Sequence, residues 1–155
     1  MNYCHLMSIA SCLFFVLQGC NRAQNSYFSY EHIPSAGWKR NYEAVFRPEI
    51  TDNMPLYGVS IELRHNNDYP YRNICFFVSL EKGGRTVRND TVEYQLADNF
   101  GKWLGSGNTL FQKTLPYIEK YHFPDTGQYT IRIKQGMRLN VLPGVEDVGL
   151  RIEKR

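Results

Sequence analysis

The sequence predicts an all-β protein: a single two-sheet β-sandwich, of jelly-roll or immunoglobulin-like type, after a cleaved lipoprotein signal peptide. Beyond residue 26, about eight short segments alternate apolar with polar residues, as strands with one buried face do. Turn-forming residues separate these segments, and uninterrupted helical periodicity is almost absent. This combination is typical of a sandwich.

The N-terminus has the pattern of a lipoprotein signal peptide. Residues 1–19 contain no Lys, Arg, Asp or Glu, and residues 6–17 are apolar apart from two serines. This run is too short to span a bilayer as a helix. Leu17-Gln18-Gly19-Cys20 then matches a lipobox, in which a small residue precedes the cysteine that takes diacylglycerol. The alternative, a buried N-terminal element with an incidental cysteine, fits the polar residues 21–26 less well.

We therefore expect residues 1–19 to be cleaved, Cys20 to carry the lipid with its palmitate-type acyl chains, residues 20–26 to form a polar tether, and residues 27–155 to form the sandwich. Several acyl chains hold a protein on a membrane nearly permanently, since each buried CH₂ contributes about 0.8 kcal/mol. Asn21 and Arg22 follow where an inner-membrane retention signal usually has Asp. The expected location is the periplasm-facing side of the cell envelope, at the outer membrane.

The length and the net charge of the chain limit the kinds of function that it can have. Cleavage before Cys20 would leave 136 residues, enough for one domain with a core. The 18 basic and 15 acidic residues give a net charge of +3, scattered along the chain, which excludes a nucleic-acid footprint. Cys75 would be the one unmodified cysteine of the mature chain, and its strand-like surroundings predict a small buried hydrophobic side chain rather than a nucleophile.

The first expected strands are residues 27–30 and 38–46, with a break at 34–37 and a proline-containing loop at 47–55. Residues 57–65 follow with a period of two, hence a strand. One face of this strand is apolar and consists of Tyr57, Val59, Ile61 and Leu63. The other face is polar and carries Ser60, Glu62 and Arg64. We expect the apolar face to be buried.

Later segments complete the pattern. After a turn at 66–68, residues 74–80 form a denser apolar run that predicts a central strand, and Lys-Gly-Gly-Arg at 82–85 indicates a hairpin into a strand at 86–96. Residues 98–108 are expected to be a loop around a packed Trp103. Residues 109–123 fit either a broken strand or a short helix, with Pro116 against an unbroken helix. Two strands, 129–134 and 148–153, close the chain.

Catalytic and metal-binding patterns are absent from the sequence. The histidines beyond the signal peptide lack metal-ligand spacing, and the glycines at 101–107 do not match a phosphate-binding loop. Glu146 and Asp147 are the one pair of acids that suggests a hydrolase, but adjacent residues in a strand point to opposite faces. We predict no enzyme, no cofactor and no metal.

Two polar segments, 64–73 and 137–145, suggest recognition or anchoring. Arg64 and Arg138 each stand at the end of an apolar strand, where a guanidinium can bind loop carbonyls or carboxylates. Structural anchoring is favoured over recognition of a partner. The candidate anchors are Arg64, Tyr69, Tyr71, Arg72, Trp103 and Arg138. Because aromatic residues are abundant, a lipid-anchored carbohydrate-binding module is the alternative function.

Several long strings identify a resemblance. They are the lipobox at Cys20, Leu63-Arg64-His65 with Tyr69-Pro70-Tyr71-Arg72-Asn73, Gly101-Lys102-Trp103-Leu104-Gly105, and Leu142-Pro143-Gly144-Val145-Glu146-Asp147. With these strings the chain resembles the gliding-motility lipoprotein GldH family of Bacteroidetes. The resemblance implies a non-enzymatic accessory or assembly component of the gliding machinery and the linked type IX secretion system, with other envelope gliding and secretion proteins as partners.

In the same bacterial group, Asp90-Thr91-Val92 looks like the short pattern used for periplasmic O-glycosylation, with Thr91 as the acceptor. A solvent-facing threonine in a strand is the equally good alternative. Members of such families also occur in bacteria that do not glide, so the resemblance does not imply motility of the host.

Overall fold

The computed structural model describes residues 26–155, which form an all-β domain. The strands are β1 (Ser26–His32), β2 (Trp38–Lys39), β3 (Ala44–Phe46), β4 (Glu49–Ile50), β5 (Tyr57–Asn66), β6 (Asn73–Lys82), β7 (Arg85–Gln95), β8 (Leu110–Tyr121), β9 (Gly127–Gln135), β10 (Val141–Leu142) and β11 (Val145–Lys154). Within this range there is no helix, and so none long enough to cross a membrane. The expected signal peptide and Cys20 lie outside the described residues.

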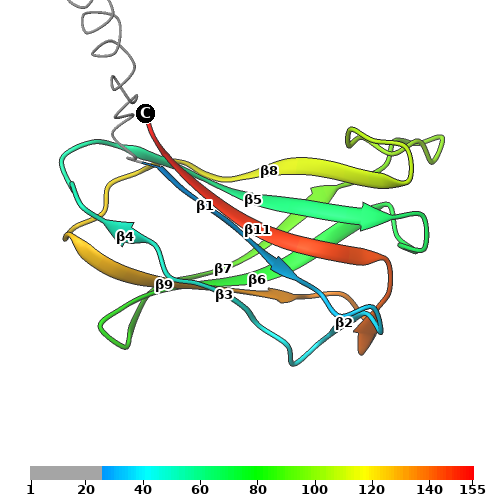
Figure 1. Ribbon diagram of the computed structural model, residues 1–155, viewed down its shortest axis with the longest axis horizontal. Helices are drawn as coiled ribbons and strands as arrows, with labels where there is room; N and C mark the ends of the chain where they lie inside the picture. The colour runs from blue at the N-terminus through cyan, green and yellow to red at the C-terminus, as the bar shows by residue number, and fades with distance from the viewer. Residues whose placement is uncertain (1–25) are drawn as a thin grey trace, which may run out of the picture.

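The strands form two main antiparallel sheets that lie one above the other (Figure 1). One has the order β1-β11-β5-β8, and the other has the order β3-β9-β6-β7, with β4 also pairing with β9. The short strands β2 and β10 pair with each other. These sheets confirm the all-β prediction, and β6 has the central position that its apolar sequence predicted, between β9 and β7.

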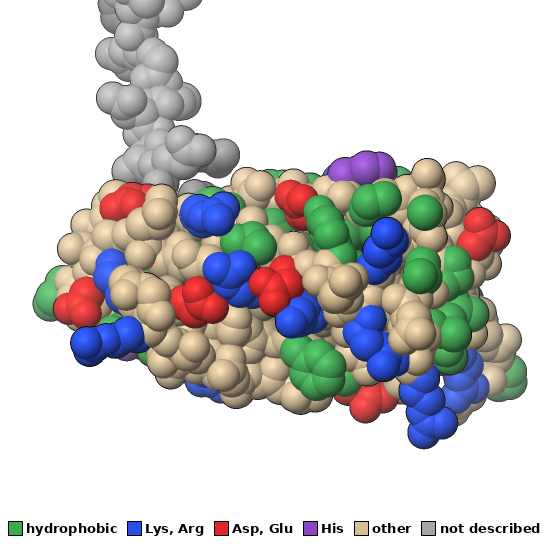
Figure 2. Space-filling view, turned by 90° about the horizontal axis from the view of Figure 1, so that it is seen from below, with side chains coloured by type: hydrophobic (Ala, Val, Ile, Leu, Met, Phe, Trp, Pro, Cys, Tyr) green, Lys and Arg blue, Asp and Glu red, His purple; other side chains and the backbone are tan. Residues whose placement is uncertain are grey.

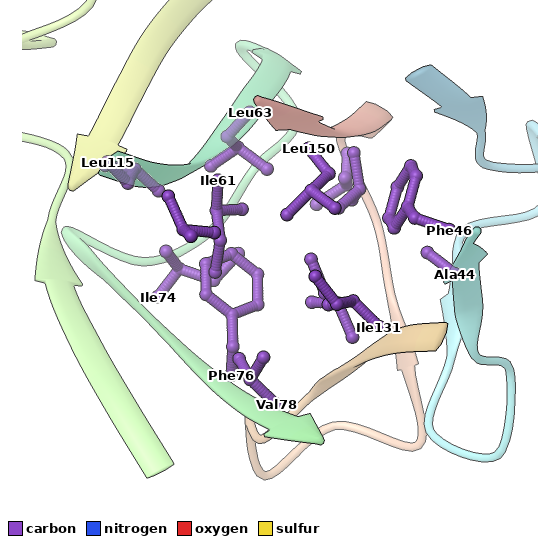
Figure 3. Packing of buried hydrophobic residues seen from close by; sticks show 14 of the residues in the cluster. Ala44, Phe46, Ile61, Leu63, Ile74, Phe76, Val78, Leu115, Ile131 and Leu150 are labelled. Atoms are coloured by element: carbon purple, nitrogen blue, oxygen red, sulfur yellow. The ribbon is translucent and has the colours of Figure 1, made fainter. Parts of the chain in front are cut away.

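The core lies between the two sheets, where alternate residues of facing strands interdigitate (Figure 3). Ile61 and Leu63 of β5 meet Ile74 and Phe76 of β6, and all four side chains are fully buried. Each such side chain contributes about 1.5–3 kcal/mol through burial. The period of two in the sequence therefore identified the inner faces correctly.

Residues 38–46 do not form the single strand that their alternation predicted. The chain turns after Lys39, where the Tyr42 backbone N–H donates to the Lys39 carbonyl at 2.9 Å, and the Trp38 indole donates to the Tyr42 carbonyl at 3.0 Å. The turn separates β2, which pairs with β10, from β3, which pairs with β9. Trp38 can thus be fully buried while the chain changes partners.

Residues 110–121 form a strand, which decides between the two alternatives for this segment. β8 lies at the edge of its sheet, so the missing N–H of Pro116 interrupts no second ladder of hydrogen bonds. The register of β8 against β5 shifts between Val59 and Ser60, next to the position that pairs with Pro116. The proline is accommodated at this irregularity.

Glu62 lies in an environment that the alternation of apolar and polar residues does not reveal. It belongs to the polar face of residues 57–65, and it is fully buried on the outer side of its sheet. Its carboxylate accepts a hydrogen bond from Arg151 Nε at 2.7 Å and another from Thr114 Oγ1 at 2.8 Å. These contacts join β5 to both of its neighbours, β11 and β8.

The cover over Glu62 depends on a glycine. Tyr30, Gly149 and Glu62 are cross-strand neighbours on β1, β11 and β5. A Cβ on Gly149 would lie 2.7 Å from the Tyr30 ring, so glycine leaves the space into which this ring packs. The guanidinium of Arg64 lies 4.0 Å from the centre of the same ring, and the side chains together exclude water.

The buried carboxylate gives a first prediction. Glu62→Ala should lower the free energy of unfolding by about 2–3 kcal/mol, because Arg151 loses its main partner while it keeps only partial contact with solvent. Urea unfolding of the chain without residues 1–20 measures this loss. The control is Glu153→Ala, which removes a half-exposed carboxylate 3.4 Å from the same guanidinium and should cost less than about 0.5 kcal/mol. Equal losses in the two variants would contradict the role assigned to Glu62.

Candidate functional site

Three loops meet at one end of the sandwich, and we call this the loop end. They connect β5 to β6, β7 to β8 and β10 to β11, at residues 67–72, 96–109 and 143–144. The strand register places Ser26 and Lys154 at the opposite end, near Tyr57, whereas Asn66 pairs with Leu110 beside the loops. The ten residues of β5 separate the two ends by roughly 30 Å (Figure 1).

An aromatic cluster fills the loop end, with His65 at its centre. The His65 ring lies 4.6 Å from Trp103, 5.5 Å from Tyr69 and 5.5 Å from Phe111, measured between centroids. Tyr71 extends the cluster at 6.2 Å from Tyr69. Three of the predicted anchors, Tyr69, Tyr71 and Trp103, therefore lie together although they come from two different loops.

The polar atoms of the aromatic cluster hold the loops to one another. The Trp103 indole donates to Asn67 Oδ1 at 3.0 Å, and the Tyr69 hydroxyl donates to the Asn73 carbonyl at 2.7 Å. His65 Nδ1 lies 3.2 Å from the Asn66 carbonyl, and its Nε2 is buried without a hydrogen-bond partner. Burial lowers the pKa of His65 and raises the pKa of Tyr69. These contacts support a structural role for Tyr69.

The third loop packs directly onto this cluster through Gly144. The Asn66 backbone N–H donates to the Gly144 carbonyl at 2.8 Å, and the Asn66 side-chain amide donates to Glu146 Oε1 at 2.6 Å. Gly144 has φ +77°, and a Cβ there would overlap the Tyr69 backbone nitrogen. The glycine is required both for its conformation and for this close approach.

The contacts of Arg64 support the structural anchoring that the sequence favoured for it. Its Nε donates to Gln112 Oε1 at 3.3 Å, and its Nη1 lies 3.6 Å from Asp147 Oδ2. The other oxygen of Asp147 lies 3.1 Å from His32 Nδ1. Asp147 and Glu146 therefore have separate partners, an arrangement that supports a structural role for both acids.

Arg138 has an exposed side chain, and a different arginine anchors its loop. Arg40 Nη2 donates to the Met137 carbonyl at 3.0 Å and also to the Arg138 carbonyl. Arg72 is exposed as well, and its Nη1 lies 3.5 Å from the Asn99 carbonyl. The sequence did not single out Arg40, because nothing in the residues around it indicates a contact with carbonyl groups almost one hundred residues later in the chain.

A shallow cavity of about 320 Å³ lies beside the loop end. It is lined by Tyr71, Asn73, Cys75, Glu93, Met137 and Arg138, among others. Cys75 is half-buried here rather than fully buried as expected. Burial, with a smaller effect of the Glu93 carboxylate, raises the pKa of its thiol, which favours the unreactive protonated form.

Thr91 is exposed on β7, opposite Phe77 of β6. Both residues line a groove of about 320 Å³ on the outer face of the β3-β9-β6-β7 sheet, together with Asn89, Arg132 and Lys134. Within residues 26–155, no three His, Cys, Asp or Glu side chains come together as potential metal ligands.

The sequence did not single out the exposed apolar side chains of the loop end. Phe100 is 97% exposed, Leu104 is 49% exposed and Leu110 is 42% exposed. Figure 2 shows the molecule from below, with hydrophobic and basic side chains at the right-hand end, which in Figure 1 includes β2 as well as the loop between β7 and β8. Sequence alone does not distinguish an exposed loop phenylalanine from one that folds back onto the core.

Comparisons with known proteins agree with the resemblance. A model of the GldH lipoprotein family matches residues 25–152. A gliding motility lipoprotein GldH homolog of Christiangramia forsetii is 34% identical over 136 residues, or 83% of this chain and 83% of the relative. Gliding motility lipoprotein GldH of Flavobacterium johnsoniae is 31% identical over 148 residues, or 90% and 91%.

Among solved structures, insecticidal delta-endotoxin Cry8Ea1 of Bacillus thuringiensis aligns with 74% of this chain and 18% of its own length, at 17% identity and a TM-score of 0.40. A similarity this weak supports no conclusion about the fold or the function.

The buried histidine predicts a pH dependence. Because the pKa of His65 is lowered in the folded state, the unfolded chain binds the proton first as the pH falls, and stability present above about pH 6.5 is lost below it. His65→Phe should flatten this loss between about pH 7.5 and 5.5 in thermal denaturation. His122→Gln, at an exposed histidine, is the control and should leave the profile unchanged. A steep profile retained in His65→Phe would show that other groups cause it.

A second prediction concerns the packing of the loops. Gly144→Ala should destabilise the domain by about 3 kcal/mol or more, since the added methyl group meets the Tyr69 backbone in addition to the strain of positive φ. Gly84→Ala is a matched control, with φ +76° and no atom within 4 Å of the added Cβ, and should cost only about 1 kcal/mol. Chemical denaturation measures both values, and similar losses would rule out the proposed steric contact.

Proposed function

The chain belongs to the GldH lipoprotein family, and we propose on this basis that it is a non-enzymatic accessory or assembly component of the gliding motility machinery and the linked type IX secretion system. The family match over most of the chain is the observation that carries the proposal. The partners would be other proteins of the cell envelope.

The anchor in this proposal is the lipid on Cys20, after removal of residues 1–19. Residues 20–26 then tether the domain, and six residue steps from Cys20 to Ser26 reach at most about 20 Å. The Ser26 end would therefore remain close to the membrane, and the sandwich domain of residues 27–155 would face the periplasm, at the outer membrane. The loop end could extend roughly 30 Å further from the anchor.

Contacts between proteins, rather than catalysis, would be the mode of action. Three of the six candidate anchors, Arg64, Tyr69 and Trp103, have their polar atoms bound inside the domain, which supports a structural role for them. The exposed apolar side chains of the loop end, Phe100, Leu104 and Leu110, offer a surface to a partner. A rigid scaffold with an exposed apolar end suits an assembly component.

The carbohydrate-binding alternative is less well supported, because the relatives are named for gliding motility. Its one favourable observation is the groove beside Phe77, a half-exposed ring flanked by Asn89 and Arg132. Binding of the domain to a glycan panel, reduced in Phe77→Ala, would support it. In the same region, O-glycosylation of Thr91 is a further proposal, consistent with the exposure of this residue.

The proposal predicts that the anchor is required for function. Cys20→Ala should move the protein from the membrane fraction to the soluble fraction and should abolish complementation of a deletion strain in assays of gliding or of type IX secretion. Cys75→Ala is the control and should stay on the membrane and complement fully, since this thiol lies inside the folded domain.

A crosslinked pull-down from membranes, read by mass spectrometry, then identifies the partners of the anchored protein. Motility or secretion components recovered with the anchored form and lost with Cys20→Ala would support the assembly role. A deletion strain with normal gliding, secretion and levels of these components would disprove it.

A further inference from the structure

We propose that the turn of residues 98–102 presents Phe100 as the anchor side chain for an apolar, acid-rimmed pocket on another envelope protein. This inference rests on the proposed function and names the contact through which the protein would act.

The turn is held by its own hydrogen bonds. Asp98 Oδ1 accepts from the backbone N–H groups of Phe100 and Lys102, both at 2.9 Å. The Gly101 N–H donates to the Asp98 carbonyl at 3.1 Å, and the Asp98 N–H donates to the Lys102 carbonyl at 2.9 Å. Gly101 adopts φ +82°, which an L-residue rarely adopts. The backbone beneath the phenyl ring is therefore fixed before any partner binds.

The base of the turn is fixed to the sandwich. Leu96 and Ala97 are buried, and their backbone N–H groups donate to the Arg72 carbonyl at 2.7 and 3.0 Å. The Leu104 N–H closes the base by donating to the Leu96 carbonyl at 2.8 Å. Trp103 lies within the aromatic cluster. Association with a partner would thus lose little backbone entropy, which is how preorganised loops gain affinity.

Phe100 is almost completely exposed at the tip of this ordered turn. Burial of a phenylalanine side chain contributes about 1.5–3 kcal/mol of stabilising free energy, and the isolated domain does not gain this contribution because the ring is exposed. Leu104 and Leu110 add half-exposed apolar surface at the same end. Anchor residues of protein interfaces have this arrangement, in which one aromatic side chain enters a pocket and the less important contacts around it exclude water.

The charges beside the ring indicate the chemistry of the partner. Arg72 and Lys102 are exposed next to the turn, while the Asp98 carboxylate already accepts two hydrogen bonds from the backbone. Two basic side chains against one carboxylate leave a small positive excess beside Phe100, and a complementary pocket would have acidic residues at its rim. Because the turn lies at the end away from Ser26, a protein beyond the anchor suits it better than the bilayer that holds the lipid.

Photocrosslinking tests the contact in the full-length, membrane-bound protein. A p-benzoylphenylalanine replaces Phe100 in one variant and Met54 in the control, where the side chain is 83% exposed near the opposite end. After irradiation of cells, we expect a discrete adduct with an identified envelope protein at position 100 only. The crosslinked peptide of the partner should be apolar with neighbouring Asp or Glu, and Lys102→Glu should lower the yield at least about threefold.

A complementation assay tests the same contact independently of the photocrosslinking. Phe100→Ser should reduce complementation of the deletion strain at least about tenfold, whereas Met54→Ser should complement fully; both side chains are exposed, so both variants should fold normally. Full complementation by Phe100→Ser, or an adduct only with lipid or with a second copy of the chain, would overturn the Phe100 contact and leave the assembly role intact. A deletion strain without any defect would instead overturn the proposed function itself.

Discussion

The carboxylate of Glu62 is a charge without contact with solvent in the sheet β1-β11-β5-β8, and the arrangement of that sheet depends on how this charge is satisfied. An unpaired buried carboxylate would cost several kcal/mol, so Arg151 and Thr114 have to reach it from the strands on either side. Tyr30 covers the site from β1 and lies in the space left by Gly149. Glu62 thereby links three strands through hydrogen bonds, with Tyr30 packed over it from the fourth.

The same sheet carries the loop end. Arg64 and His65 follow Glu62 along β5, so the strand that is held at its middle also presents the side chains that order the loops. Arg64 extends toward Asp147 on β11, and His65 is enclosed by rings from two loops. The aromatic cluster is therefore an extension of the core, and it gives the β7–β8 loop a fixed base. The exposed turn at Phe100 owes its definite position to these buried contacts.

The residues of the loop end have two different roles. Some hold the loops together inside the domain, and others are exposed to solvent. Tyr69 and Trp103 were predicted as possible partner or structural anchors, and their polar atoms are bound within the domain. The ring of Phe100 differs from them, because the hydrogen bonds of its turn come from the backbone, the Asp98 side chain and Arg72 and leave the ring exposed.

The sequence by itself determined the all-β class, the inner faces of the main strands, the hairpin at Gly83 and Gly84 and the family, because these depend on local patterns: a period of two, turn chemistry and ordered strings. The tertiary structure alone decided that Glu62 is buried, that residues 38–46 divide between two partners, that Arg40 rather than Arg138 anchors its loop and that Phe100 stays exposed. Each of these outcomes depends on contacts between residues far apart in the chain, and alternation along one strand cannot show what covers its outer face.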